Sequence, residues 1–241
     1  MTLQDSQKNL VSDPSEDARR NGSRPAPSPK DSAARQEIAA YPTPKGKRFM
    51  DVVLGTLALS ALWPIWLLAI WLIKTDSPGQ ALLAQKRVGL GGRTFKFYKF
   101  RTMVNRAEND DYGRIPRGDL RKTLLSPPGR DPRVTPIGSV LRKTTVDELP
   151  QLLNVIKGDM SLVGPRPDIP EIVASWPPPF RQRHKVRPGM TGLAQINGRS
   201  DLTHYEKVRY DLDYLRRHPL SRDLAILLKT VGLVLSKKGA R

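Results

Sequence analysis

The apolar positions of this chain are concentrated in one long segment, and elsewhere they alternate with polar ones. Residues 52–73 run without a charged side chain, a length that suits a membrane helix of about 20 residues. Pro64 lies near the middle, and a proline inside a helix removes one main-chain hydrogen bond and clashes with the preceding turn. The pattern predicts a membrane-anchoring helix over residues 45–74 that is broken at Pro64.

Two geometries fit a helix broken in this way. Each arm is roughly 10–12 residues or about 15–18 Å long, too short to cross a hydrocarbon core of about 30 Å alone. Either a kinked helix spans the bilayer, or a helical hairpin enters it and returns to the same face. Basic residues flank both ends: Lys45, Lys47 and Arg48 before, and Lys74, Lys86 and Arg87 after. Because positive flanks stay in the cytoplasm, the pattern favours the re-entrant hairpin and leaves the single span open.

The segments on either side of the anchor differ in composition. Residues 1–44 are rich in Ser, Pro and charged residues and have few large apolar side chains, which predicts a disordered arm. Residues 75–241 are polar, and their apolar positions are arranged as in a folded domain. Because both flanks of the anchor are basic, we expect this domain, 75–241, on the cytoplasmic side.

The pattern within residues 75–241 predicts a mostly helical α+β fold. Residues 85–103 alternate around a Gly-rich turn at 89–92, which is typical of a β-hairpin. We expect residues 105–130 to be a loop. The expected helical regions are 137–157 in two pieces, a short helix within 168–185 broken by three consecutive prolines, and 205–217. Residues 224–235 predict an apolar helix followed by basic residues, which suits the membrane interface and a protein core equally well.

Charge and composition narrow the classes of function. The net charge is +18, from 41 Lys and Arg against 23 Asp and Glu, which indicates an anionic partner such as a phospholipid surface, a phosphorylated substrate or a nucleic acid. Aromatic residues are only 6%, so a stacking platform for single-stranded nucleic acid is not indicated. The absence of Cys excludes a disulfide scaffold, a thiolate metal site and a cysteine nucleophile.

The densest chemical signal is the run Thr144–Gln151, which contains Asp147 and Glu148. Thr145 followed three residues later by Glu148 also fits a helix capping box, which would make Glu148 a structural residue. The alternative is chemical, because an ionised Asp can attack phosphorus and a neighbouring Glu can hold Mg²⁺ on a diphosphate. Both interpretations stay open from this segment alone.

Three basic segments provide candidate phosphate contacts. Arg166 lies between Pro165 and Pro167, which fix the backbone around a guanidinium suited to phosphate oxygens. Alternation along a strand would place Lys99 and Arg101 on one face. Arg187 precedes a glycine-rich loop at 189–192 where backbone approaches a ligand closely. Each segment taken alone fits a solvated basic surface equally well.

Together these segments closely resemble the bacterial sugar transferase family, the small monotopic phosphoglycosyl transferases. The resemblance covers about Lys47 to Leu235 and rests on KFRTM, DPRVTPIGSVLRKTTVDELPQLLNVIKGDMSLVGPRP and VRPGMTGLAQINGR, in this order after the apolar segment. It implies a re-entrant membrane helix and a dyad in which Asp147 is the nucleophile and Glu148 the Mg²⁺ ligand. It also implies that Arg166 binds a donor phosphate, with Lys99, Arg101 and Arg187 as further phosphate contacts. The family's usual Ser-Pro break is here Trp63-Pro64.

The activity implied by the resemblance is transfer of a sugar 1-phosphate from a UDP-sugar to a polyprenyl phosphate, as the initiating step of exopolysaccharide or other surface glycan synthesis. UMP is released, and the intermediate is a covalent phospho-sugar on Asp147. The implied location is the bacterial inner membrane, with phospholipid as a partner and no nucleic acid. The other class of function compatible with the charge is a non-catalytic, membrane-anchored binder of anionic polymers. The sequence specifies neither the sugar nor the oligomeric state, and it is compatible with a homodimer.

Overall fold

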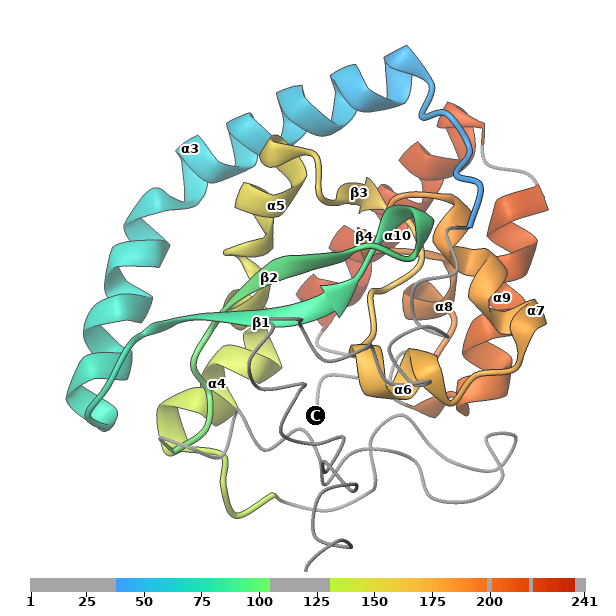
Figure 1. Ribbon diagram of the computed structural model, residues 1–241. Coiled ribbons are helices and arrows are strands. Elements are labelled where there is room, and N and C mark those ends of the chain that lie inside the picture. Colours follow the sequence, from blue (N-terminus) through green and yellow to red (C-terminus); the bar gives the residue numbers. More distant parts are fainter. Residues whose placement is uncertain (1–37, 105–130, 199–200, 217–218, 237–241) are drawn as a thin grey trace, which may run out of the picture. The chain divides into compact units, whose positions relative to one another are not determined.

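The computed structural model of the protein describes residues 38–104, 131–198, 201–216 and 219–236 (Figure 1). All of them belong to one compact unit, Ala34–Arg241. The predicted disordered arm, up to residue 37, and the predicted loop at 105–130 lie outside the described residues. The last part of that arm, residues 38–44, is ordered, since Ile38 and Tyr41 donate main-chain hydrogen bonds to Gly91 and Lys185.

The predicted apolar helix forms, and it is longer than expected. Helix α3 covers Lys45–Asp76 and is long and apolar enough to cross a membrane. It continues through Pro64, so the expected break in the helix at this residue is not observed. Figure 1 shows instead one curved helix, which passes α5 and reaches α4. A proline removes a single hydrogen bond, and a long helix absorbs that loss by bending.

Both ends of α3 are bound to the same folded body. In the first turn, Lys47 donates to Asp223 at 2.6 Å and to the carbonyl of Val163 at 3.0 Å. One turn later, buried Asp51 accepts from Ser161 and from the main chain of Leu162. At the other end, the Arg101 guanidinium donates to three main-chain carbonyls, those of Ile73, Ser77 and Pro78.

The predicted hairpin and the two-piece helix are confirmed. Strands β1 (Leu82–Val88) and β2 (Thr94–Phe100) pair antiparallel around the 3₁₀ turn η1 (Leu90–Gly92). The two helical pieces are α4 (Pro136–Thr144) and α5 (Gln151–Lys157), with the 3₁₀ turn η3 (Val146–Glu148) between them. Buried Asn154 ties α5 to β2, because it accepts from the main chain of Tyr98 and donates to that of Lys96.

A second, parallel pair of strands was not predicted. Strands β3 (Ser161–Val163) and β4 (Gly189–Thr191) have three residues each, too short for alternation to reveal them. They pack closely because of glycine: a Cβ on Gly189 would lie 2.1 Å from the nitrogen of Gly164. The glycine-rich segments around 164 and 189–192 therefore serve strand packing.

The remaining elements follow the predicted order. Helix α6 (Pro170–Ala174) ends before the proline run, α7 (Pro178–Arg181) begins within it, and the 3₁₀ turn η4 (Gln182–Lys185) follows. They are followed by α8 (Leu193–Ile196), α9 (His204–Arg216) and α10 (Leu220–Ser236). The predicted helices at 205–217 and 224–235 are thus confirmed as α9 and α10.

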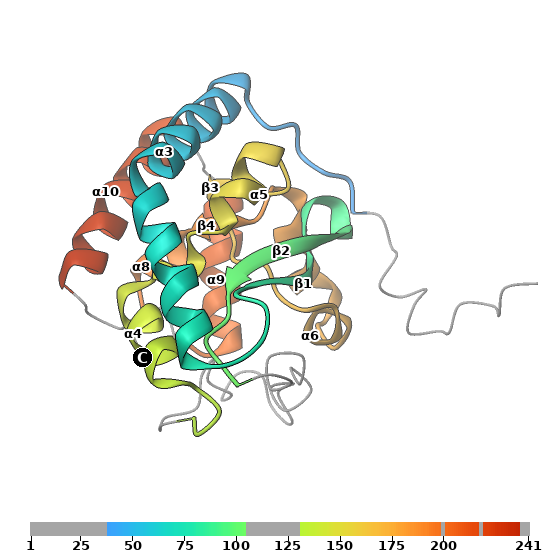
Figure 2. The ribbon, with the colours of Figure 1, turned by 90° about the vertical axis from the view of Figure 1, so that its left-hand side faces the viewer.

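The apolar side chains divide between a core and an exposed face. A central cluster of buried residues joins β2, α5, β3, α9 and α10, and includes Phe97, Val155, Val163, Tyr214 and Ile226. Helices α3 and α10 lie on the same side of the domain (Figure 2) and also carry large exposed apolar side chains. These side chains are Phe49, Leu57, Trp63, Leu67, Leu68 and Trp71 on α3, and Leu220, Leu224, Leu228 and Val231 on α10. Such a patch is typical of a surface that meets a membrane or a partner.

Candidate active site

The two adjacent carboxylates lie on η3, the short turn that joins α4 to α5. Thr145, just before the turn, has φ 62° and ψ 12°, the left-handed conformation that β-branched residues rarely adopt. The Thr145 side chain caps no helix, so the capping-box interpretation of Thr145 and Glu148 is wrong. Strained backbone of this kind is concentrated at functional sites, where the surrounding structure stabilises it.

Arg166 contacts Glu148 across 18 positions of the sequence. Its two terminal nitrogens donate to the two carboxylate oxygens, at 3.0 Å and 2.6 Å. The side chain of Arg166 is 36% exposed and that of Glu148 is 23% exposed, so the pair is open to a soluble ligand. Proximity to Glu148 raises the pKa of Arg166. The bidentate geometry is the one that guanidinium uses for carboxylate and phosphate alike.

Asp147 is electrostatically unlike an ordinary surface aspartate. Burial, and next the charge of Glu148, raise the pKa of Asp147 to about 7, against the opposing influence of nearby cations. These cations are Arg166, Arg142 and Lys99. Asp147 is therefore poised between its neutral and ionised forms at physiological pH, a property that is common among catalytic groups.

Arg142 is a residue of this site that the sequence analysis missed. It lies in the last turn of α4, and its Nε donates to the hydroxyl of Thr102 at 2.9 Å. The contact is possible because α4 is pressed against the chain after β2, where a Cβ on Gly138 would lie 2.1 Å from the Thr102 carbonyl oxygen. The available signal was its place five residues before Asp147. The structure thus assembles Asp147, Glu148, Arg166, Lys99 and Arg142 in one region.

Two of the predicted phosphate contacts have other partners. Arg101 is 3% exposed, and its guanidinium binds the carbonyls at and just beyond the end of α3. Unpaired carbonyls at a helix C-terminus attract cations, so this is a helix-capping role. We therefore assign Arg101 to capping the C-terminal end of α3 instead of the predicted phosphate contact.

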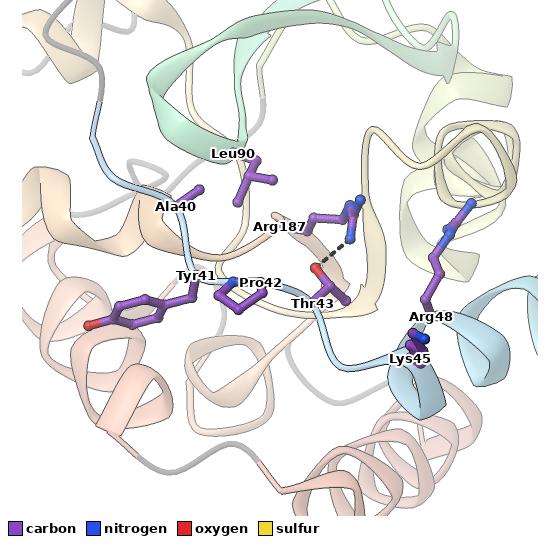
Figure 3. Close-up of a pocket in the computed structure, with 8 residues that line it drawn as sticks. All are labelled: Ala40, Tyr41, Pro42, Thr43, Lys45, Arg48, Leu90 and Arg187. Atoms are coloured by element: carbon purple, nitrogen blue, oxygen red, sulfur yellow. Dashed lines mark hydrogen bonds between the residues drawn. The ribbon is translucent and has the colours of Figure 1, made fainter.

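Arg187 lies at a different cavity, of ≈ 570 Å³, whose lining includes residues 40–43, Lys45 and Arg48 (Figure 3). Its guanidinium donates to the carbonyl of Gly158 at 2.9 Å and to the hydroxyl of Thr43. Arg48 also lines the cavity, and its guanidinium binds two carbonyls at the C-terminus of α5. The structure does not bring Arg187 to the two carboxylates.

The dyad fits a divalent cation only together with a ligand. Within the described residues, no group of three or more Asp, Glu, His or Cys side chains is arranged to hold a metal ion. Mg²⁺ commonly binds through one or two carboxylates plus the phosphate oxygens of a substrate. Glu148 supplies such a carboxylate, so the residues present fit a Mg²⁺ ion that arrives with a diphosphate.

Comparison with known proteins identifies the chain's family. The family model for bacterial sugar transferases matches residues 43–237, which include the described residues from the end of the arm to α10. The chain belongs to the bacterial sugar transferase family. The match includes the dyad turn and the Pro165–Pro167 segment of this sugar transferase.

Curated relatives of this sugar transferase cover most of it. It is 40% identical over 206 residues to the exopolysaccharide production protein ExoY of Sinorhizobium fredii, covering 80% of this chain and 87% of that protein. It is 41% identical over 202 residues to UDP-glucose:undecaprenyl-phosphate glucose-1-phosphate transferase of Caulobacter vibrioides, covering 80% and 71%. Undecaprenyl-phosphate galactose phosphotransferase of Salmonella typhimurium is 38% identical over 80% of this chain and 41% of its own length.

Proposed function

We propose that this sugar transferase moves a sugar 1-phosphate from a UDP-sugar to undecaprenyl phosphate, the initiating step of exopolysaccharide synthesis. One relative is named as a UDP-glucose:undecaprenyl-phosphate glucose-1-phosphate transferase and another as an undecaprenyl-phosphate galactose phosphotransferase. The observation that carries the assignment to a site is the arrangement of Asp147, with its raised pKa, beside the Glu148–Arg166 pair.

In the first half-reaction, a carboxylate oxygen of Asp147 attacks the phosphorus that bears the sugar. The bond from that phosphorus to the bridging oxygen of the diphosphate breaks, and UMP leaves with the electron pair. The product is an acyl phosphate between Asp147 and the sugar phosphate. Negative charge grows on the phosphoryl oxygens, and the cations around Asp147 are placed to stabilise it.

In the second half-reaction, a phosphate oxygen of undecaprenyl phosphate attacks the same phosphorus. The acyl phosphate bond breaks and the electron pair returns to Asp147, which regenerates the carboxylate. The product is a diphosphate that joins lipid and sugar. Splitting the transfer in this way means that the soluble donor and the lipid acceptor need not be bound together.

Mg²⁺, held by Glu148 on the donor diphosphate, would neutralise part of the charge there. Both oxygens of Glu148 accept from Arg166 in the structure. Arg166 is therefore the residue that must release Glu148 and take up phosphate oxygens when the donor arrives. Lys99 and Arg142 complete the cationic surroundings of Asp147.

We also propose that α3 enters the bilayer and returns to the cytoplasmic face, where UDP-sugars are found. Its first turns and its last turn are both tied to one body, through Lys47, Asp51 and Arg101. A helix that crossed the membrane would place those two ends on opposite sides. The exposed apolar side chains of α3 and α10 supply the lipid-facing surface.

The nucleophile is tested by trapping the intermediate. Membranes or detergent-solubilised protein are mixed with UDP-glucose or UDP-galactose and Mg²⁺, without lipid acceptor, and the protein is analysed by mass spectrometry. We expect an adduct of one hexose phosphate that maps to Asp147. D147N should lose the adduct and lower transfer to undecaprenyl phosphate by on the order of 10³-fold or more.

The matched control is D213N, the same substitution at an aspartate whose side chain is 56% exposed. It should retain both adduct and transfer. Transfer by D147N at the parent rate, or a hexose phosphate on another residue, would show that Asp147 is not the nucleophile.

A further inference from the structure

Arg166 is held at two places, and only one of them is in the candidate active site. Its guanidinium pairs with Glu148, whereas its main-chain carbonyl accepts a hydrogen bond from Arg183 at 2.5 Å. Arg183 lies on η4 and is 1% exposed. The backbone that carries Arg166 is therefore bound from the interior of the domain.

Arg183 belongs to a group of four buried charges that we call the quartet, made of Asp168, Arg183, Lys207 and Asp211. Arg183 lies 2.7 Å from Asp168 and 2.8 Å from Asp211. The amine of Lys207 contacts both oxygens of Asp168, at 2.9 Å and 2.7 Å. Since each member is at most 8% exposed, the quartet is part of the interior.

The four charges of the quartet cancel when both aspartates are ionised, and Arg87 adds a further positive charge near Asp168. Two cations face two carboxylates, and the neighbouring His184 and His204 add no charge at neutral pH because burial lowers their pKa values to about 3 and about 4. A buried, balanced network of this kind holds its members in one geometry, since any shift leaves a charge unpaired at low dielectric.

The geometry of Arg183 requires a guanidinium. The Arg183 guanidinium donates to the Arg166 carbonyl and to Asp168, forms an ion pair with Asp211, and lies over the Trp176 ring at 5.0 Å from the centroid. A lysine keeps the positive charge but has neither the planar fork nor the stacking face. Replacing Arg183 with Lys should therefore disturb its geometry more than the charge of the quartet.

We propose that Arg183 is a positioning residue, which sets the direction of the Arg166 side chain by fixing the Arg166 carbonyl from within the quartet. The inference rests on the proposed function, because Arg166 is the residue that meets the donor phosphate there. Within the described residues, the quartet reaches the candidate active site through the hydrogen bond from Arg183 to the Arg166 carbonyl.

The constraint passes through a short stretch of backbone. Pro165 and Pro167 fix φ on either side of Arg166, which leaves few soft dihedral angles between the two anchored ends. On one side, the Pro165 carbonyl accepts from Gly189 at 2.9 Å, and on the other the Asp168 carbonyl accepts from Val88 at 2.9 Å. The Arg183 contact at the carbonyl between them fixes the peptide plane after Arg166, and thereby the direction of its side chain.

The test is a double-mutant cycle on the first half-reaction. Single-turnover UMP release at saturating UDP-sugar and Mg²⁺ is measured for the parent, R183K, R166A and R183K/R166A, with the melting temperature of each protein. Displacing a catalytic cation by about 1 Å costs on the order of 10²-fold. We expect R183K to slow release by roughly 10–100-fold in the parent, and by less than about 2-fold when Arg166 is already absent.

The matched control is R222K, the same substitution at an arginine that pairs with Asp213 on the exposed side of α9. It should leave UMP release unchanged in both backgrounds. If R183K does not fold, D211N is taken through the same cycle. Burial raises the pKa of Asp211 to about 6, so the native protein already carries an uncharged side chain at this position in mild acid. The D211N variant imitates that uncharged form.

The outcomes separate this inference from the proposed function. Equal losses in both backgrounds would show that Arg183 supports the fold without acting through Arg166, and would overturn the inference. If R166A releases UMP at the parent rate, the role given to Arg166 in the proposed function fails instead. A loss confined to the parent background supports the inference.

Discussion

Asp147 and Asp168 both interact with Arg166, but their surroundings shift their pKa values in opposite directions. Burial and then the neighbouring Glu148 raise the pKa of Asp147 to about 7. Burial alone would also raise the pKa of Asp168, but Lys207 and Arg183 outweigh it and hold this pKa well below its ordinary value. Burial raises the pKa of both carboxylates, so the neighbouring charges account for the difference.

Under the proposed function, the comparison is between a carboxylate that reacts, Asp147, and one that stabilises the fold, Asp168. Asp168 is in contact with two cations, at 2.7 Å each, so its negative charge is compensated. The cation nearest to the dyad, Arg166, is bound to Glu148, which leaves Asp147 with a like charge beside it. A nucleophile needs this incomplete compensation, because a fully paired carboxylate is both less basic and less accessible.

The largest expected effect is on stability, from removing the charge at Asp168. D168N leaves Lys207 and Arg183 with too little negative charge in a buried site, which typically costs about 3–5 kcal/mol. Chemical denaturation of the detergent-solubilised protein measures the change in unfolding free energy. D213N, at an exposed ion pair, should stay within about 0.5 kcal/mol of the parent. If D168N changes the unfolding free energy by no more than D213N does, Asp168 does not stabilise the fold in the way described here.

A smaller effect is expected from pH on the first half-reaction. Asp147 must be ionised to attack, so with a pKa of about 7 the single-turnover rate should fall roughly tenfold between pH 8 and pH 6. The quartet residue Asp168 does not titrate in this range, because its pKa is lowered, whereas Asp211, with a pKa of about 6, is partly protonated at the lower end of the range. Circular dichroism over the same range checks that the fold is unchanged. A rate that is flat from pH 8 to pH 6 would contradict the raised pKa of Asp147.

The smallest expected effect is that of D147N on the unfolding free energy. This substitution should stabilise the protein, whereas D168N should destabilise it. The pKa of Asp147 is higher in the folded protein than its ordinary value of 3.8, so the folded state binds the proton more tightly. Its ionised form therefore destabilises the fold as pH rises from about 4 to above 7. D147N should raise stability more at pH 8 than at pH 5, by on the order of 1 kcal/mol once the partial exposure of Asp147 is allowed for. Equal gains at both pH values would argue against this account.

Much of the fold was predictable because local patterns determine it. The hairpin, the two-piece helix around the dyad, α9 and α10 each show a clear alternation or helical period. The parallel pair β3–β4 was missed because three-residue strands carry no period, and its glycines resemble those of a ligand loop. The continuity of α3 through Pro64 was missed because a proline removes a single hydrogen bond, which a long helix absorbs by bending.

The candidate site was predictable only in part, because a cation has the same sequence signature whether it binds phosphate or helix carbonyls. Arg166 lies where a phosphate contact was expected, but Arg101 and Arg187 bind main-chain oxygens instead. Which of these roles an arginine takes depends on which helix end packs beside it. The role of Arg183 had no sequence signal, since it depends on contacts with residues 15 to 28 positions away.

The attachment of α3 at both ends has a mechanical consequence. Arg101 donates hydrogen bonds to carbonyls at and just beyond the end of this helix. The next residue, Thr102, accepts a hydrogen bond from Arg142, which lies near Asp147. The end of the helix is thus connected to the surroundings of Asp147 through the Arg101 hydrogen bonds, one peptide bond and the Thr102–Arg142 hydrogen bond, so we expect a change in bilayer thickness or lateral pressure to alter the rate. Turnover measured in bilayers of different acyl-chain length would then report on the stiffness of that linkage.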